Sequence, residues 1–192
     1  MMKRDACLAA LLPHIAEEIV IGTYSTAFDW IKLRPNHPFN YNSVGAMGLA
    51  SSHGLGLALA RPDRRIIVLD GDGSLLMNLG SLVTIGTVAP ANLYHFVSEN
   101  GTYEANGGHP IPGRDRLSFS GLAREAGYRS SHSFSDLASF KAGIGAVLGE
   151  RGPALIDLKV EPGEPFLPGP EDFNALFSRD SRDRFKAAFE KL

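Results

Sequence analysis

Short apolar runs alternate with helical segments along this chain, and this alternation narrows the possible folds to one class. The clearest run, residues 65–69, is rich in β-branched side chains and ends at Asp70 and Gly71. Continuous apolar runs of this kind are typical of strands buried on both faces of a parallel sheet. Further strands are expected at residues 19–21, 93–97, 128–131 and 155–160. The sequence therefore predicts a doubly wound α/β domain, a parallel sheet with helices on both faces.

Helices are predicted between these strands from the spacing of apolar and small residues. The N-terminal segment, residues 3–18, carries apolar side chains at helical spacing, and its Glu17 and Glu18 are expected to be solvated. The Gly-, Asn- and Pro-rich stretch 99–114 predicts a loop. Further helices are expected at residues 23–30, 47–60, 75–88, 118–126 and 135–149.

Length and composition suit one domain with a short appendage. The chain has 192 residues, of which 44% are hydrophobic and 21% charged, as in ordinary globular proteins. Residues 1–160 are expected to form the domain. Residues 161–192 are expected to form a Pro/Gly connector and an amphipathic C-terminal helix that packs on the domain or on a partner chain. The apolar positions of this helix are Phe173, Leu176, Phe177, Phe185, Phe189 and Leu192.

Charge and cysteine content argue against several classes of function. The 19 Lys and Arg stand against 21 Asp and Glu, and a formal net charge of -2 disfavours broad binding to nucleic acid or anionic membranes. Cys7 is the only cysteine, so no disulfide framework or thiolate zinc cluster can form within the chain. No run approaches the roughly 18 apolar residues of a membrane span. We therefore expect a cytoplasmic protein.

The stretch Asp70-Gly71-Asp72-Gly73-Ser74 directly follows the clearest strand. Ligands of doubly wound folds bind at the carboxyl ends of the strands, and glycines there let a ligand approach the backbone closely. A helix that follows offers backbone amides to phosphate. A carboxylate at that place, Asp72, would repel phosphate unless a divalent cation lay between them. Magnesium suits such an arrangement because it takes few protein oxygens together with phosphate oxygens.

The same residues have three other interpretations. A calcium loop of the EF-hand type would need Gly and Glu where Leu75 and Ser81 stand, so it is excluded. A phosphatase that uses Asp70 and Asp72 as an Asp-x-Asp pair remains an alternative. A plain turn between strand and helix would also account for Gly-Asp-Gly.

A second polar loop favours the metal interpretation. Asn100 follows Asp72 by 28 residues and comes just after the predicted strand 93–97. Two parallel strands joined by a helix bring their carboxyl ends together at about this separation. One carboxylate, one amide oxygen and one backbone carbonyl could then hold a cation and leave positions for phosphate oxygens and water.

Three stretches together resemble the diphosphate-binding domain of the thiamine diphosphate-dependent decarboxylase superfamily, in which GDG is followed by Asn. They are GAMGLASSHGLGLALA at 45–60, LDGDGSLLMNLGSL at 69–82 and ENGTYEANGG at 99–108. The resemblance covers about residues 5–160 and is strongest to sulfopyruvate and phosphonopyruvate decarboxylases. It implies the cofactors thiamine diphosphate and Mg²⁺, with the metal held by Asp72, Asn100 and the carbonyl of Thr102.

The same resemblance assigns the rest of the cofactor site. Met47 would lie between the two rings of the cofactor, and the carbonyl of Gly45 would accept a hydrogen bond from the aminopyrimidine. Four further residues would face the diphosphate: Gly73, Ser74, Thr23 and Ser25. Capping of the helix that follows the first strand is an equally good explanation for the last two.

In these enzymes the glutamate that activates the cofactor lies on a second, pyrimidine-binding domain, for which we expect no room in the remaining length of this sequence. The resemblance therefore implies a hetero-oligomer with a separate pyrimidine-binding subunit, acting as a decarboxylase on a small 2-oxo acid such as sulfopyruvate or phosphonopyruvate. Residues 104–110 depart from the Ser-Thr-Gly-Gly/Asn-Gln pattern of the relatives. Glu104 and His109 are our candidates for catalytic residues there, although His109 reads equally well as an exposed loop residue. The alternative is a homologue that binds the cofactor without catalysis.

Overall fold

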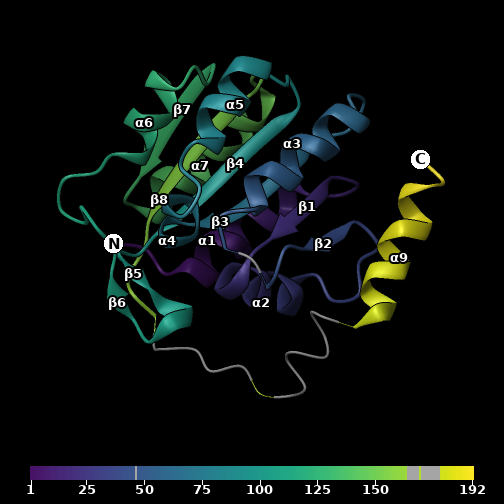
Figure 1. Cartoon of the computed structure of the whole chain (residues 1–192), viewed down its shortest axis with the longest axis horizontal. Coiled ribbons are helices and arrows are strands. Elements are labelled where there is room, and N and C mark those ends of the chain that lie inside the picture. The colour runs from purple at the N-terminus through teal and green to yellow at the C-terminus, as the bar shows by residue number, and fades with distance from the viewer. Residues whose placement is uncertain (46, 164–168, 170–177) are drawn as a thin grey trace.

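A six-stranded parallel sheet forms the centre of the computed structural model, which describes residues 1–45, 47–163, 169 and 178–192 (Figure 1). The strand order is β2-β1-β3-β4-β8-β7, so the chain first builds to one side of β1 and then to the other. The strands of this sheet are β1 (Ile19–Gly22), β2 (Asn40–Asn42), β3 (Ile66–Gly71), β4 (Leu93–Glu99), β7 (Ser130–Phe134) and β8 (Ala154–Lys159). The prediction of a doubly wound α/β domain is thus confirmed.

Helices cover both faces of the sheet and enclose two apolar cores. On one face, α1 (Arg4–Leu11) and α7 (Leu137–Gly149) pack against Val20 and Ile67. On the other, α3 (Ala50–Ala60), α5 (Ser81–Val88) and α6 (Phe119–Glu125) pack against Ile19 and Val68. Because neighbouring residues of a strand face opposite sides, the central strands need apolar residues at every position. This explains their continuous apolar runs.

Several element boundaries differ from the prediction, each for a local reason. The expected helix 75–88 is divided into α4 (Asp72–Leu76) and α5, because residues 77–80 form a turn. The expected helix 47–60 begins only at Ala50, since Gly48 adopts φ +86°. The predicted loop 99–114 contains a two-stranded hairpin of β5 (Thr102–Tyr103) and β6 (His109–Pro110), with the short helical turn Glu104–Asn106 between them.

The N-terminal helix also ends early, and this corrects the prediction for one glutamate. After α1 the chain makes the short turn Leu12–His14, which contains Pro13, and then leaves the helical path. Glu18 consequently lies against the start of β3, where it is 8% exposed, forms an ion pair with Arg65 and accepts a hydrogen bond of 2.6 Å from the Ala16 amide. The expectation of solvated surface was therefore wrong for Glu18, whereas Glu17 is exposed.

The C-terminal helix α9 (Arg179–Phe189) packs on this chain beside the edge strand β2 (Figure 1). The remaining described helix, α2 (Tyr24–Leu33), follows β1 in the chain. The rings of Phe185 and Tyr41 meet edge-on with their centroids 5.2 Å apart. Of the apolar positions predicted for this helix, Phe173, Leu176 and Phe177 lie outside the described residues. The domain boundary near residue 160 stays a prediction. Among the helices that the structure describes, none has the length and apolarity needed to cross a membrane.

Candidate functional site

A pocket lies at the carboxyl ends of β1, β3 and β4, beside the point where the strand order changes direction. Such switch points are where doubly wound folds bind their ligands. Nine of the eleven predicted site residues line this pocket: Thr23, Ser25, Met47, Asp72, Gly73, Ser74, Asn100, Thr102 and Glu104. The two others, Gly45 and His109, are exposed residues outside its lining.

Asp72 is the first residue of α4 and is buried at the bottom of this site, with 1% of its surface exposed. Its Oδ1 accepts a hydrogen bond of 2.7 Å from the Gly73 amide, and its Oδ2 one of 2.6 Å from the Gly101 amide. Burial raises the pKa of the Asp72 carboxyl to about 6, although these amides act in the opposite direction. The carboxylate would therefore gain from a cation bound beside it.

Asn100 belongs to the turn between β4 and β5, and the register of β3 and β4 brings this turn next to Asp72. Gly71 pairs with Ser98, so the two strands end side by side. The side-chain Oδ1 of Asn100 accepts hydrogen bonds from the amide of Thr102 at 2.8 Å and from its hydroxyl at 3.1 Å. The Gly101 amide then links this turn to Asp72, so that a carboxylate, an amide oxygen and the Thr102 residue meet in one pocket.

The donor set of this pocket fits a hard cation such as Mg²⁺. Carboxylate, amide and carbonyl oxygens are the ligands that magnesium takes, together with water and phosphate oxygens. Each carboxylate oxygen of Asp72 that accepts a backbone hydrogen bond keeps a further lone pair, whereas Oδ1 of Asn100 accepts two hydrogen bonds from Thr102 and would have to exchange the longer one, from the hydroxyl, for a cation. Within the described residues no group of three or more His, Cys, Asp or Glu could hold a metal. A metal here would therefore have a mixed set of protein ligands.

Close packing explains why glycine follows Asp72. A Cβ atom on Gly73 would lie 2.5 Å from Cδ1 of Tyr103, whose ring is thus in contact with the Gly73 backbone. Next to it, the hydroxyl of Ser74 accepts a hydrogen bond of 3.0 Å from the Gly48 amide. The turn at Gly48 and the start of α4 therefore form one wall of the pocket.

Thr23 and Ser25 lie at the start of α2, on another wall. Thr23 is the N-terminal cap residue of this helix, and its hydroxyl donates a hydrogen bond of 2.9 Å to the carbonyl of Ser43. Ser25 lines the pocket from the first turn of the helix. Between them Tyr24 adopts φ +42°, a conformation that bulky residues rarely adopt. Local strain of this kind is often found at functional sites.

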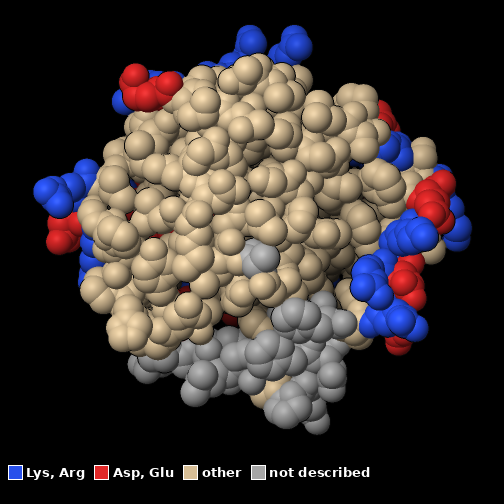
Figure 2. Space-filling model, viewed as in Figure 1, with Lys and Arg blue, Asp and Glu red and all other residues tan. Residues whose placement is uncertain are grey.

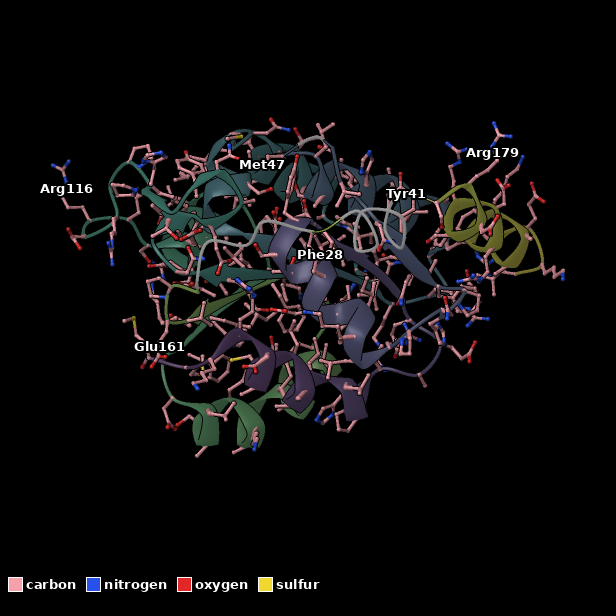
Figure 3. All side chains as sticks on the ribbon, turned by 90° about the horizontal axis from the view of Figure 1, so that it is seen from below. Phe28, Tyr41, Met47, Arg116, Glu161 and Arg179 are labelled. Carbon is pink, nitrogen blue, oxygen red and sulfur yellow. The ribbon has the colours of Figure 1, made fainter. Side chains whose placement is uncertain are left out.

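The Met47 side of the pocket continues into the segment that precedes α3. Met47 is half-buried and lines the pocket, and it is labelled in the view from below in Figure 3. The carbonyl of Gly48 accepts a hydrogen bond of 3.0 Å from the Asn78 side chain. Gly45, with φ +91°, is exposed two residues before Met47.

The two candidates for catalytic residues lie in different surroundings. Glu104 is 5% exposed; its Oε2 pairs with Arg4 and accepts a hydrogen bond of 3.4 Å from Asn100, while its buried Oε1 has no hydrogen-bond partner. The Nε of Arg4 also donates to Asp29 at 2.7 Å. His109 is exposed on β6. Sequence reasoning missed Arg4 because nothing near residue 4 marks it as part of a distant site.

Asp70 faces the interior and does not line the pocket. It is fully buried, and its Oδ2 lies 3.3 Å from Nε2 of His95, whose Nδ1 lies 3.1 Å from the hydroxyl of Tyr128. The Asp-x-Asp phosphatase interpretation requires Asp70 and Asp72 to reach one substrate together. The structure does not bring both carboxylates into one pocket, so that interpretation was wrong.

Comparison with known proteins identifies the family. Residues 21–158 match the family model described as "Thiamine pyrophosphate enzyme, C-terminal TPP binding domain". The chain is 35% identical to phosphonopyruvate decarboxylase of Streptomyces viridochromogenes over 161 residues, which are 83% of this chain and 40% of that protein. It is 34% identical to sulfopyruvate decarboxylase subunit beta of Methanothermobacter thermautotrophicus over 171 residues, 88% of this chain and 87% of that subunit.

A solved structure shares the fold. The thiamine diphosphate-dependent 4-hydroxybenzoylformate decarboxylase of Rhodococcus jostii RHA1 superposes with a TM-score of 0.69 at 20% identity, over 84% of this chain and 33% of that chain. The chain thus spans about two fifths of the phosphonopyruvate decarboxylase that it matches but most of the sulfopyruvate decarboxylase subunit. The family match, the sheet and the pocket agree: this chain belongs to the thiamine pyrophosphate enzymes and contains their C-terminal TPP binding domain.

Proposed function

We propose that this chain is the diphosphate- and magnesium-binding subunit of a two-chain thiamine diphosphate-dependent 2-oxo acid decarboxylase. Its match to 87% of a separate sulfopyruvate decarboxylase subunit supports the two-chain arrangement. The cofactor part rests on one observation, the hydrogen bond of 2.6 Å from the Gly101 amide to Asp72, which joins the two polar loops. In this proposal residues 1–160 form the binding domain and residues 161–192 form its appendage.

In this proposal Asp72, Asn100 and the carbonyl of Thr102 hold Mg²⁺, and the metal offsets the charge of both the carboxylate and the diphosphate. Gly73 and Ser74 face the diphosphate. Thr23 and Ser25 complete this end of the site, with Thr23 acting mainly through the position of α2, since its hydroxyl is bonded to Ser43. At the other end Met47 supports the cofactor rings and Gly45 offers its carbonyl to the aminopyrimidine.

When bound, thiamine diphosphate supplies a carbon nucleophile and an acceptor for the electron pair that decarboxylation releases. This chain contributes orientation and a carboxylate. Glu104 lines the pocket, with its Oε2 held by Arg4 and its buried Oε1 beside the backbone of Gly163, and it is retained as a candidate for a catalytic carboxylate. His109, exposed on β6, is retained as a candidate for exchange of protons with solvent.

A partner chain is needed for activation of the cofactor. Among the residues described, the one glutamate that lines the pocket is Glu104, and its charge is paired with Arg4. In this proposal the glutamate that contacts the aminopyrimidine comes from a separate pyrimidine-binding subunit, as the likeness to a separate sulfopyruvate decarboxylase subunit supports. The relatives named sulfopyruvate and phosphonopyruvate decarboxylase support a small 2-oxo acid with a second anionic group as substrate. Arg4 is already shared by Asp29 and Glu104, so we expect other cations to bind that group.

Calorimetric titration with thiamine diphosphate, with and without Mg²⁺, tests the binding part of this proposal. The lone chain should bind the cofactor only when Mg²⁺ is present and should release no carbon dioxide from sulfopyruvate or phosphonopyruvate. Co-expression with a pyrimidine-domain chain from the same genome should give a complex that does. Decarboxylation by the lone chain at the rate of the complex would contradict the two-chain proposal.

A cofactor-binding homologue without catalysis is the second candidate. It is favoured by the exposed position of His109, in the segment 104–110 that departs from the relatives. It predicts a complex that binds thiamine diphosphate and Mg²⁺ but releases no carbon dioxide from any 2-oxo acid. The same carbon dioxide assay therefore distinguishes the two candidates.

A further inference from the structure

One face of the molecule carries almost no charge. Residues 35–60 and 73–98 contain no Lys, Arg, Asp or Glu, and they include α3, the turn 77–80 and α5. Figure 2 shows this side of the molecule, where Lys, Arg, Asp and Glu gather at the rim and leave a broad uncharged area between them. We call the exposed residues of 47–60 and 77–88 the α3–α5 face. Helices in contact with water normally carry charged residues on their outer side, so this face is unusual.

Large apolar side chains are exposed on this same face. Five of the six large hydrophobic residues that are exposed in the described part of the chain belong to it, the sixth being Met1. The five are Leu49, Leu59, Met77, Val83 and Val88, with 39%, 58%, 50%, 58% and 43% of their surface exposed. Single exposed apolar residues are normal, but several on one uncharged face are typical of a site of protein association.

The outer side of α3 is also shaped for close approach. Gly56 lies in the middle of this helix and is exposed, and a Cβ atom there would meet nothing within 4 Å. Glycine is unfavourable inside a helix, and neither packing within the chain nor an unusual φ requires it here. Its exposed neighbours one turn away, Ser52 and Ala60, are also small. Small outward residues allow the backbone of another helix to come close.

The face is continuous with the cofactor pocket. Met47 lines the pocket and Leu49, two residues later, is exposed on the face. Between them Gly48 is bonded on one side to Ser74, inside the pocket, and on the other to Asn78, in the turn 77–80. A chain that covered the face would therefore reach the Met47 side of the pocket opening.

We propose that the α3–α5 face is the docking surface for the pyrimidine-binding partner subunit, which contacts it with an uncharged, apolar helix packed along Gly56. This inference rests on the proposed function, which requires a partner carboxylate on the Met47 side of the pocket. A second copy of this chain fits less well, because it would cover the face without bringing the pyrimidine-binding domain that the proposed function requires. Charged rims on both proteins would then surround an uncharged centre, as in other interfaces.

Two substitutions on the face and one matched control test this inference. Leu59→Glu puts a charge on the outer side of α3, and Gly56→Leu fills the space that the partner helix would occupy, starting from a Cβ position that has no neighbouring atom within 4 Å. Ala146→Glu makes the same kind of change at an exposed position of α7, on the opposite side of the sheet. Each variant is co-expressed with the pyrimidine-domain chain, and the affinity of the purified subunits is measured by calorimetry.

Leu59→Glu and Gly56→Leu should each weaken subunit binding at least about tenfold, as expected at the centre of an interface, and Ala146→Glu should leave it unchanged. Magnesium-dependent binding of thiamine diphosphate by the lone variants should equal that of the wild type. Equal affinity of the partner for wild type and for both face variants would overturn the docking surface while leaving the proposed function intact. If the wild-type chain alone formed a dimer and Leu59→Glu made it monomeric, a second copy of this chain would be the occupant of the face. That result would also overturn the proposed docking of the partner subunit. Failure of the wild type to bind thiamine diphosphate with Mg²⁺ would overturn the proposed function itself.

Discussion

The backbone amide of Gly101 donates a hydrogen bond of 2.6 Å to Oδ2 of Asp72, and this bond ties the turn after β4 to the end of β3. Both strands are buried and in register, so the two loops start from neighbouring positions. Within the described part of the chain, Asp72 is thus held by the backbone amides of Gly73 and Gly101, and its Oδ2 is directed towards the turn that contains Asn100. The predictions that follow concern this site and the packing around it.

Replacement of Asp72 by Ala should abolish the magnesium-dependent part of cofactor binding. The carboxylate is the only charged oxygen in the expected metal ligand set, so its loss should exceed the roughly 10–100-fold effect of removing an outer-shell partner. Calorimetric titration of the lone chain with thiamine diphosphate and Mg²⁺ measures this. Asp115→Ala, at an exposed position in another loop, is the matched control and should bind as the wild type does. Retention of wild-type affinity in Asp72→Ala would rule out the metal site.

Gly73→Ala should destabilise the fold, whereas Gly56→Ala should stabilise it. A Cβ on Gly73 would lie 2.5 Å from Cδ1 of Tyr103, and overpacking of this kind costs about 1–3 kcal/mol. At Gly56 there is open space, and the helical propensity of Ala should add about 0.5–1 kcal/mol. Urea unfolding gives both values. The double variant Gly73→Ala with Tyr103→Ala removes the ring and should recover part of the stability lost in Gly73→Ala. If no stability were recovered, the clash between the added Cβ and the Tyr103 ring would not be the cause of the destabilisation.

The single substitution Arg4→Met should lower the free energy of unfolding more than the double substitution of Arg4→Met with Glu104→Gln. With Arg4 gone, the buried carboxylate of Glu104 loses its cation, which typically costs about 3–5 kcal/mol for a buried pair. Glu104→Gln in the Arg4→Met background removes that charge and should restore most of the stability. A double-mutant cycle of unfolding free energies measures the coupling. Simple additivity of the two substitutions would show that Arg4 and Glu104 do not interact in solution.

Cys7 should react with thiol reagents only when the protein unfolds. Cys7 belongs to α1, and its side chain is fully buried. Burial raises the pKa of its thiol to about 11, so very little thiolate forms near neutral pH. Labelling by a chromogenic disulfide should therefore be slow in buffer and fast in denaturing urea. The variant Ala9→Cys, exposed on the outer side of the same helix, provides the comparison and should show a second thiol that reacts at once. Rapid labelling of native Cys7 would contradict the observed burial.

The central strands could be predicted because their environment imposes a pattern on the sequence. β3 is covered on both faces, so every position from Ile66 to Leu69 is apolar. β2 was missed because this three-residue edge strand, Asn40–Asn42, is held by backbone pairing with β1 and carries mostly polar side chains. Its place in the sheet depends on contacts that leave no local pattern.

The candidate site, like the sheet, could be predicted only in part from the sequence. Glycine and polar residues directly after strands point to ligand binding, so Asp72 and Asn100 could be found from their spacing. Arg4 and Tyr24 could not, since one reaches the pocket through the packing of α1 and the other through an unusual backbone angle. Glu18 was misplaced for the same reason, because the early end of the first helix turned it towards Arg65.

The contact between Arg4 and Glu104 joins residues that are 100 positions apart in the chain. One wall of the pocket is therefore completed only after a ribosome has made more than half of the protein and α1 has docked on the finished sheet. Closing so large a loop is slow compared with forming the neighbouring turns. Completion of this pocket wall is thus coupled to folding of the entire domain and not to the GDG turn alone.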